Sequence, residues 1–237
     1  MSEHDDEKLL ERLARLDTSI VSDVLDEAGL PNHALSSAMR LLDPATKLVG
    51  RAFCAQGHDR ITAQNPPVGP GYSPYAMEER LVPGDVAVIA SSGHAVGSMI
   101  GGLMAYCMQS RGCRGLVTDG GIRDAAELKA FGFPAFSSFH TPLNSSRRWS
   151  LSAIQEPVQL PGMAASAITV NPGDLLLGDV DGLVVIPRRH AEPIIAASEE
   201  LAAIEGRIWA MLRAGSDRRS AFEQNPRFRH IRPVDAR

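Results

Sequence analysis

The side chains best suited to chemistry stand together in residues 121–127 of the sequence. Asp124 and Glu127 are three residues apart, so in a helix both carboxylates point from the same face of one turn. Arg123 beside them is a permanent cation whose forked donor geometry suits carboxylates and enolates. Because Mg²⁺ needs only one or two carboxylates and keeps several waters, this group can hold a hydrated divalent metal beside a cation.

The same two acids have a structural alternative. Asp-x-x-Glu before an apolar run is also a capping box, in which Asp124 is the N-cap of a helix and the Glu127 side chain bonds back to the Asp124 N–H. Spacing alone favours this cap over a metal site, because short motifs often match by chance.

A second candidate is the glycine-rich segment from Gly93 to Leu103, which is expected to open a helix. Glycines let backbone N–H groups approach a ligand, and a helix N-terminus adds positive potential, so the segment is suited to bind a carboxylate or a phosphate. It fits neither the GxGxxG pattern nor the Walker pattern. His94 and His140 are possible bases, although a lone loop histidine is more often polar surface.

Two strand–loop–helix units position these residues. A strand at 86–90 leads through the glycine-rich loop into a helix that runs to about Gln109, and a strand at 115–118 leads through a turn into a helix at 124–131. The other expected elements are helices at 9–16, at 17–29 with Asp17-Thr18-Ser19 as N-cap, and from about Pro193 to Gly215, and strands at 48–55, 158–160, 167–170, 175–177 and 183–186.

The pattern predicts one α/β domain over residues 1–215 and an extended tail over residues 216–237. The tail carries six arginines and three acids, which suits packing on a neighbouring subunit better than RNA contact. A formal net charge of -4 for the 237 residues argues against a nucleic-acid partner. Neither a signal peptide nor a membrane-spanning apolar run is visible, and three scattered cysteines form no framework, so we expect a reduced, cytoplasmic protein with no membrane partner.

The run from Gly115 to Glu127 resembles the signature of RraA-like proteins, a family that includes 4-hydroxy-4-methyl-2-oxoglutarate aldolases and oxaloacetate decarboxylases. Its active members share a glycine, twenty residues, Arg-Asp, two residues and then Glu or Asp, and Gly102, Arg123, Asp124 and Glu127 fit every position. The resemblance covers roughly residues 10 to 205. Further matches lie at Leu16-Asp17-Thr18 with Asp23, at residues 49–53, at Pro83-Gly84-Asp85, at Pro172-Gly173-Asp174 and at residues 178–187.

The resemblance implies a role for each matching residue. Asp124 would hold Mg²⁺ or Mn²⁺, directly or through water, and Glu127 would position metal-bound water. Arg123 would bind the keto oxygen of a 2-keto acid substrate and stabilise the enolate. The substrate carboxylate would be held by the backbone amides of Gly101, Gly102, Leu103 and Met104.

The fold implied by the resemblance is an α/β/β/α sandwich with swivelling β/β/α-like topology, assembled as a homotrimer or a dimer of trimers. Two features depart from the family. Dedicated aldolases usually carry an aspartate where this chain has Gly102, which favours the broader aldolase and decarboxylase group. The loop from Asp59 to Tyr75 replaces a usual helix and would reshape the mouth of the pocket.

The function implied is that of a divalent-metal-dependent carbon–carbon lyase, a class II pyruvate aldolase or oxaloacetate decarboxylase, working through a pyruvate enolate. The alternative is a non-catalytic regulator like the family's namesake, which binds and inhibits a ribonuclease. Retention of Asp124 and Glu127 favours the lyase, because a binding role has no need of a metal-ligating acid pair.

Overall fold

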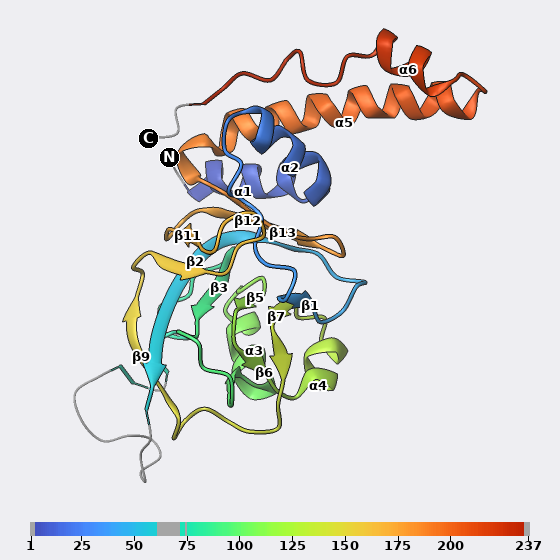
Figure 1. Cartoon of the computed structure of the whole chain (residues 1–237). Helices are drawn as coiled ribbons and strands as arrows, with labels where there is room; N and C mark the ends of the chain where they lie inside the picture. Colours follow the sequence, from blue (N-terminus) through green and yellow to red (C-terminus); the bar gives the residue numbers. More distant parts are fainter. Residues whose placement is uncertain (1–2, 61–71, 74, 235–237) are drawn as a thin grey trace.

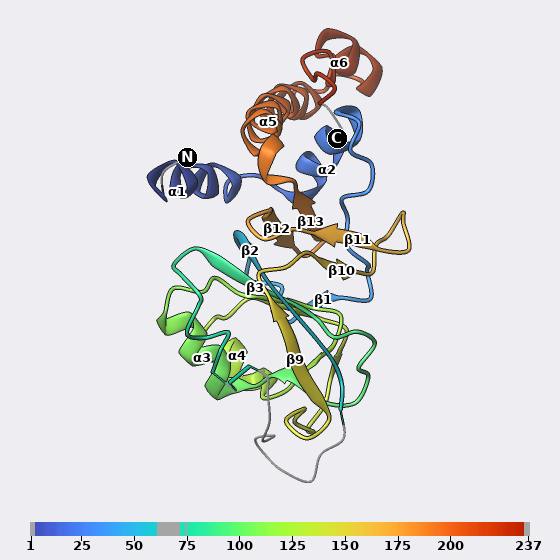
Figure 2. The same cartoon turned by 90° about the vertical axis from the view of Figure 1, so that its left-hand side faces the viewer.

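Helices cover both sides of a β-layer in the computed structural model of the chain, which describes residues 3–60, 72–73 and 75–234 (Figure 1). Two views agree that one group of helices lies beyond β12 and β13 and that α3 and α4 lie at the opposite side (Figures 1 and 2). This confirms the predicted α/β/β/α arrangement in a single domain. The helices are α1 (Glu3–Leu13), α2 (Thr18–Glu27), α3 (Gly102–Ser110), α4 (Ala125–Ala130), α5 (Ala191–Arg213) and α6 (Arg218–Gln224), with a 3₁₀ turn at Arg188–His190.

The strands of the described residues form one large sheet and two small ones. In the large sheet β2, β3, β5 and β7 are parallel neighbours, while β1, β9, β12 and β13 pair antiparallel at its margins. Its strands are β1 (Arg40–Leu41), β2 (Leu48–Asp59), β3 (Asp85–Ala90), β5 (Leu116–Thr118), β7 (Ala135–Ser137), β9 (Trp149–Ile154), β12 (Leu175–Asp179) and β13 (Gly182–Ile186). The small sheets are β4 (Ser98–Ile100), β6 (Gly121–Ile122) and β8 (Phe139–His140), and β10 (Val158–Leu160) with β11 (Ile168–Val170).

The apolar residues of the helices and strands are buried where their spacing predicts. Every residue of β3 is buried, as expected of a central parallel strand that is covered on both faces. Along α5, Ile194, Ile195 and Leu201 repeat at helical spacing and pack with Leu10 and Val21 in the core between helices and sheet. This core fixes the helical layer on β12 and β13.

The N-terminus of α2 is held by an acid from a distant strand. Asp17 occupies the predicted N-cap position, but its side chain makes no capping bond. The carboxylate of Asp179, at the end of β12, instead accepts hydrogen bonds from Thr18 N at 2.9 Å and Thr18 Oγ1 at 2.7 Å. A cap of this kind satisfies an amide that the helix leaves without a partner.

Asp179→Ala should therefore lower the free energy of unfolding by about 2 kcal/mol, the scale of a lost charged cap. Urea unfolding would measure it. Asp181→Ala is the matched control, because Asp181 is exposed and its side chain makes no bond to α2 in the described structure. Equal stability of the two variants would contradict the capping role.

The C-terminal tail is not extended throughout, which corrects that prediction. Residues 218–224 form α6, and the chain then returns along α5 to the core. Ile231 is buried in the core of the helical layer, and Val234 N donates to Ala28 O at 2.9 Å. Arg227 bonds to Asp23 at 2.5 Å. Packing of the tail on a neighbouring subunit stays a prediction.

The structure tests two other expectations only in part, one on the loop from Asp59 to Tyr75 and one on membrane-spanning segments. The unusual loop from Asp59 to Tyr75 lies mostly outside the described residues, which omit 61–71 and 74. Among the helices of the described ranges, none is both long and apolar enough to cross a membrane.

Candidate functional site

Three parallel strands of the large sheet each continue into a strand of a small sheet, and this arrangement builds the site. β3, β5 and β7 lead into β4, β6 and β8, which are again parallel, with Ile100 of β4 in register with Ile122 of β6. The carboxyl ends of β4 and β6 therefore meet at one edge, where Arg123 N donates to Ile100 O at 3.2 Å. Gly101 and Arg123 follow these strands, so the two candidate segments come together.

Asp124 has a left-handed backbone, with φ 57° and ψ 36°. This conformation is uncommon outside glycine, although aspartate is among the residues that tolerate it. A capping residue needs an extended backbone, and the Asp124 side chain makes no capping bond to α4. Its Oδ2 accepts instead from Gly102 N, at 2.9 Å, across the site. The capping-box interpretation is therefore wrong for Asp124.

Glu127 lies in the first turn of α4, with its carboxylate against Gly102. A Cβ on Gly102 would overlap Glu127 Oε2 and lie 3.3 Å from Asp124 Cβ. The Glu127 carboxylate thus occupies the space that a side chain at position 102 would fill. Both predicted acids meet at the N-terminus of α3, where the helix dipole favours negative charge.

The Arg123 side chain lies against Gly101, which follows β4. A Cβ on Gly101 would lie 2.7 Å from Arg123 Nε and 2.7 Å from Asp124 Oδ2. Arg123 Nε stands 3.5 Å from Asp124 Oδ2, and the two side chains are 38% and 37% exposed. An ion pair this exposed contributes little to stability, so the charges remain available to a ligand.

The four predicted amide donors are not equivalent. The Gly102 N–H is already engaged by Asp124. Leu103 and Met104 follow in the first turn of α3, where backbone N–H groups have no acceptor within the helix. The Leu103 side chain is 84% exposed. Binding of a substrate carboxylate by these amides stays a prediction.

The donor set suits a hydrated metal ion. Among the residues that the structure describes, no group of three or more His, Cys, Asp or Glu side chains is placed to hold a metal. Asp124 and Glu127 supply two carboxylates at Gly102. Mg²⁺ is commonly bound through one or two carboxylates and keeps several waters, so these residues fit it and do not fit a fully protein-ligated ion.

The two candidate histidines differ. His94 is 3% exposed, which corrects the expectation of polar surface. Its Nδ1 lies 2.5 Å from Asp59 Oδ1, and its Nε2 accepts from Gly97 N at 2.8 Å. Both ring nitrogens are therefore used to hold the loop before β4, which leaves none free to act as a base. His140 is exposed on β8.

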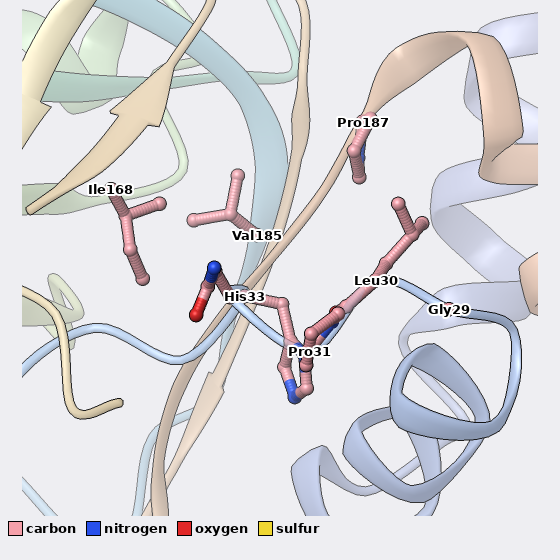
Figure 3. A pocket seen from close by; sticks show the side chains of 8 residues that line it. Gly29, Leu30, Pro31, His33, Ile168, Val185 and Pro187 are labelled. Atoms are coloured by element: carbon pink, nitrogen blue, oxygen red, sulfur yellow. The ribbon is translucent and has the colours of Figure 1, made fainter. Parts of the chain in front are cut away.

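A separate cavity of about 210 Å³ lies between the segment that follows α2 and strands β11 and β13 (Figure 3). Leu30, Ile168 and Val185 line it, and none of its lining residues is acidic. His33 also faces it, with Nδ1 2.7 Å from Leu30 O and Nε2 2.8 Å from Ser22 Oγ. This cavity offers no charged group for the chemistry of a keto acid, and the acid cluster is the stronger candidate.

Comparison with known proteins shows the family of this chain. The aldolase/RraA family model matches residues 18–185. A putative 4-hydroxy-4-methyl-2-oxoglutarate aldolase of Halalkalibacterium halodurans is 31% identical over 185 residues, which is 77% of this chain and 78% of that protein. This chain belongs to the aldolase/RraA family. The RraA-like resemblance seen in the sequence is thereby confirmed, and the relative's name supports a family of lyases.

Two solved structures share the fold. An uncharacterised protein from Pseudomonas syringae pv. tomato matches with a TM-score of 0.77 at 28% identity, over 91% of this chain and 96% of that one. RraAS2 of Streptomyces coelicolor, described as an unusual member of the RNase ES inhibitor RraA family, matches with a TM-score of 0.70 at 27% identity, over 89% and 98%. The names of these similar proteins therefore include both an aldolase and a member of an RNase inhibitor family.

Proposed function

We propose that this protein is a divalent-metal-dependent carbon–carbon lyase acting on 2-keto acids through a pyruvate enolate. The observation that carries the proposal is the left-handed Asp124, whose carboxylate lies at the N-terminus of α3 instead of capping its own helix. A strained backbone at a cluster of charges is typical of functional sites. The substrate would be a 4-hydroxy-2-oxo diacid for aldol cleavage or oxaloacetate for decarboxylation.

The chain's own residues have distinct parts in this reaction. Free amides of α3 would orient the keto acid by its carboxylate, with the keto oxygen toward the Arg123 guanidinium. In aldol cleavage the 4-hydroxyl loses its proton as the C3–C4 bond breaks and its carbon leaves as a carbonyl, whereas in decarboxylation carbon dioxide leaves. In both reactions the electron pair of the broken bond stays on the pyruvyl fragment, and Arg123 would stabilise the negative charge that develops on the keto oxygen. Proton uptake at carbon then gives pyruvate.

Asp124 and, through water, Glu127 would hold the divalent ion. A bound Mg²⁺ or Mn²⁺ acts as a Lewis acid toward the keto oxygen. Asp124 Oδ2 can serve as a ligand while Gly102 N–H fixes its orientation, which is the support that metal-binding carboxylates commonly receive.

A binding protein without lyase activity is the second candidate, supported by the structural match to RraAS2. In that case the exposed Arg123 and Asp124 would form part of a protein-binding surface. A binding role does not require a metal, whereas the lyase does, so metal dependence separates the two functions.

Pyruvate release from oxaloacetate or a 4-hydroxy-2-oxo diacid should require Mg²⁺ or Mn²⁺. We expect EDTA to abolish the release and added metal to restore it, because two carboxylates bind a largely hydrated ion only moderately. A coupled pyruvate assay measures the activity, and titration calorimetry with Mn²⁺ measures binding separately. Full activity in chelator would refute the metal-assisted mechanism, and no release from any 2-keto acid would favour the binding protein.

A further inference from the structure

The loop from Ser91 to Gly97 leads directly into the candidate site. It joins β3 to β4, and β4 ends next to Gly101, the N-cap residue of α3. Ser92 in this loop has a left-handed backbone with φ 56°, a conformation that residues other than glycine seldom adopt. Such a backbone persists only where the surrounding contacts hold it. The contacts of this loop therefore help to decide where the site residues lie.

His94 joins the loop to the end of β2. Its side chain is 3% exposed, and its Nδ1 lies 2.5 Å from Oδ1 of Asp59, the last residue of β2. An ionised carboxylate can only accept hydrogen bonds, so Nδ1 carries the proton and Nε2 does not. Nε2 is thereby the acceptor for Gly97 N–H, at 2.8 Å. The other neutral tautomer would turn a donor toward this amide, so Asp59 selects the tautomer that can hold Gly97.

The start of β4 is also held by the segment that follows β8. A Cβ on Gly97 would lie 2.9 Å from Ser145 Cα, so the two backbones are in close contact. Ser98 N donates to Leu143 O at 2.9 Å, and Ser145 Oγ donates to Ser98 O at 2.7 Å. These bonds and the one from Gly97 to His94 together fix the point at which β4 begins.

β4 in turn places the first turn of α3 against the acids of the site. β4 is only three residues long, and its pairing with β6 is irregular between Ser98 and Ile100. Its own ladder therefore gives little resistance to a shift along β6, and the contacts at its start become important. A shift would move Gly102 away from Asp124, together with the free amides that follow it. A misplacement of about 1 Å can cost about 100-fold in rate.

We propose that His94 is a positioning residue for the lyase, and that Asp59 acts through it. Nε2 of His94 holds Gly97, and Gly97 holds β4 where the free amides of α3 can meet the substrate carboxylate. This inference rests on the proposed function. Because the amides bind the carboxylate before and during cleavage alike, loss of the bond to Gly97 should raise KM more than it lowers kcat.

Two substitutions divide the bonds of His94 between them. His94→Gln places an amide oxygen near the position of Nε2, where it can still accept from Gly97 N–H. His94→Asn places an amide nitrogen near the position of Nδ1, so it keeps the bond to Asp59 and loses the acceptor for Gly97. For whichever of oxaloacetate and a 4-hydroxy-2-oxo diacid the wild type cleaves, His94→Asn should raise KM about tenfold or more, and His94→Gln should stay within about threefold.

Hydrogen exchange tests the same bonds without any measurement of activity. Amides in peptides that span residues 95–104 should exchange faster in His94→Asn and in Asp59→Leu, because both leave Gly97 N–H without a fixed acceptor. The Asp59 side chain is 73% exposed, so its loss should leave the fold intact. Adding Asp59→Leu to His94→Gln should change exchange no further, since glutamine needs no carboxylate to present its oxygen. His58→Asn, at an exposed histidine next to Asp59, is the matched control and should exchange like wild type.

The two readouts separate this inference from the proposed function. No pyruvate release by the wild type would refute the lyase, whereas the exchange rates would still show whether Asp59 and His94 hold β4. If the wild type releases pyruvate and His94→Gln and His94→Asn have equal KM, the positioning role is overturned. A further rise in exchange when Asp59→Leu is added to His94→Gln would equally contradict the proposal, because Asp59 would then act without His94. Thermal unfolding of both His94 variants accounts for any stability that they lose in common.

Discussion

Arg123→Ala should lower kcat for pyruvate release by about 100-fold or more, the effect of removing one donor that stabilises a developing oxyanion. The guanidinium lies over Gly101 at the edge where β4 and β6 end, and the Arg123 side chain is 38% exposed, so a substrate oxygen can reach it. The loss should appear in kcat more than in KM, because the charge on oxygen develops during cleavage. Steady-state kinetics with oxaloacetate and a 4-hydroxy-2-oxo diacid would measure it.

The controls for Arg123 separate catalysis from folding. Arg123→Lys should recover little of the activity, because a point charge replaces a planar fork. Neither variant should unfold at a much lower temperature, since the ion pair to Asp124 is exposed and the backbone bond from Arg123 N to Ile100 O remains. Arg40→Ala removes an exposed arginine on β1 and should keep wild-type turnover. Wild-type turnover in Arg123→Ala would remove this residue from the mechanism.

Most helices and strands could be predicted from the sequence, but the strands of the small sheet at the site, β4, β6 and β8, could not. The strand expected at 158–160 is β10 within the same bounds, and the helix expected to end before Gly215 is α5. The sequence does not predict β4 and instead indicates a helix directly after the glycine-rich loop. Three residues give no periodicity that distinguishes a strand from the start of a helix. β4 exists because β6, about twenty residues later, pairs with it.

The acids of the family motifs have different roles that residue type does not reveal. Asp85 and Asp174 both follow a Pro-Gly turn and are buried. Asp85 accepts from Val82 N at 3.0 Å, and Asp174 accepts from Asn171 N at 2.9 Å, so each closes a turn at the start of a strand. Burial raises the pKa of Asp85, although bonds from Val82 and Arg51 oppose this. Asp85 and Asp174 therefore stabilise the fold, whereas Asp124, the acid of the site, is exposed.

The resemblance to RraA-like proteins predicts which residues form the candidate site, but it does not predict their geometry. The spacing of Asp124 and Glu127 permitted both a capping box and a ligand pair. The choice depends on the backbone angles of one residue, and a left-handed aspartate is uncommon enough that sequence patterns do not predict it. Sequence patterns likewise do not predict that Gly102 leaves room for the Glu127 carboxylate, because this contact joins two different helices. The trimeric or hexameric assembly stays a prediction.

Asp124→Asn should collapse turnover by about 100-fold while leaving stability within about 0.5 kcal/mol of wild type. Asparagine tolerates the left-handed backbone, and its side-chain oxygen can still accept from Gly102 N. The substitution removes the negative charge, which makes the residue a much poorer ligand for a hard cation. Glu127→Gln is its companion, because glutamine has the same length and can occupy the same space over Gly102.

Metal affinity and stability provide readouts for these two variants that do not depend on catalysis. Titration calorimetry should show Mn²⁺ binding at least tenfold weaker in Asp124→Asn, and a smaller loss in Glu127→Gln, whose contact is through water. Thermal unfolding without metal should match wild type for both. Glu156→Gln changes an exposed acid far along the sequence and should keep both activity and binding.

If Asp124→Asn and Glu127→Gln both release pyruvate at the wild-type rate, the acids are structural. The second candidate, a protein that binds a partner without cleaving a carbon–carbon bond, would then be the better account of this chain.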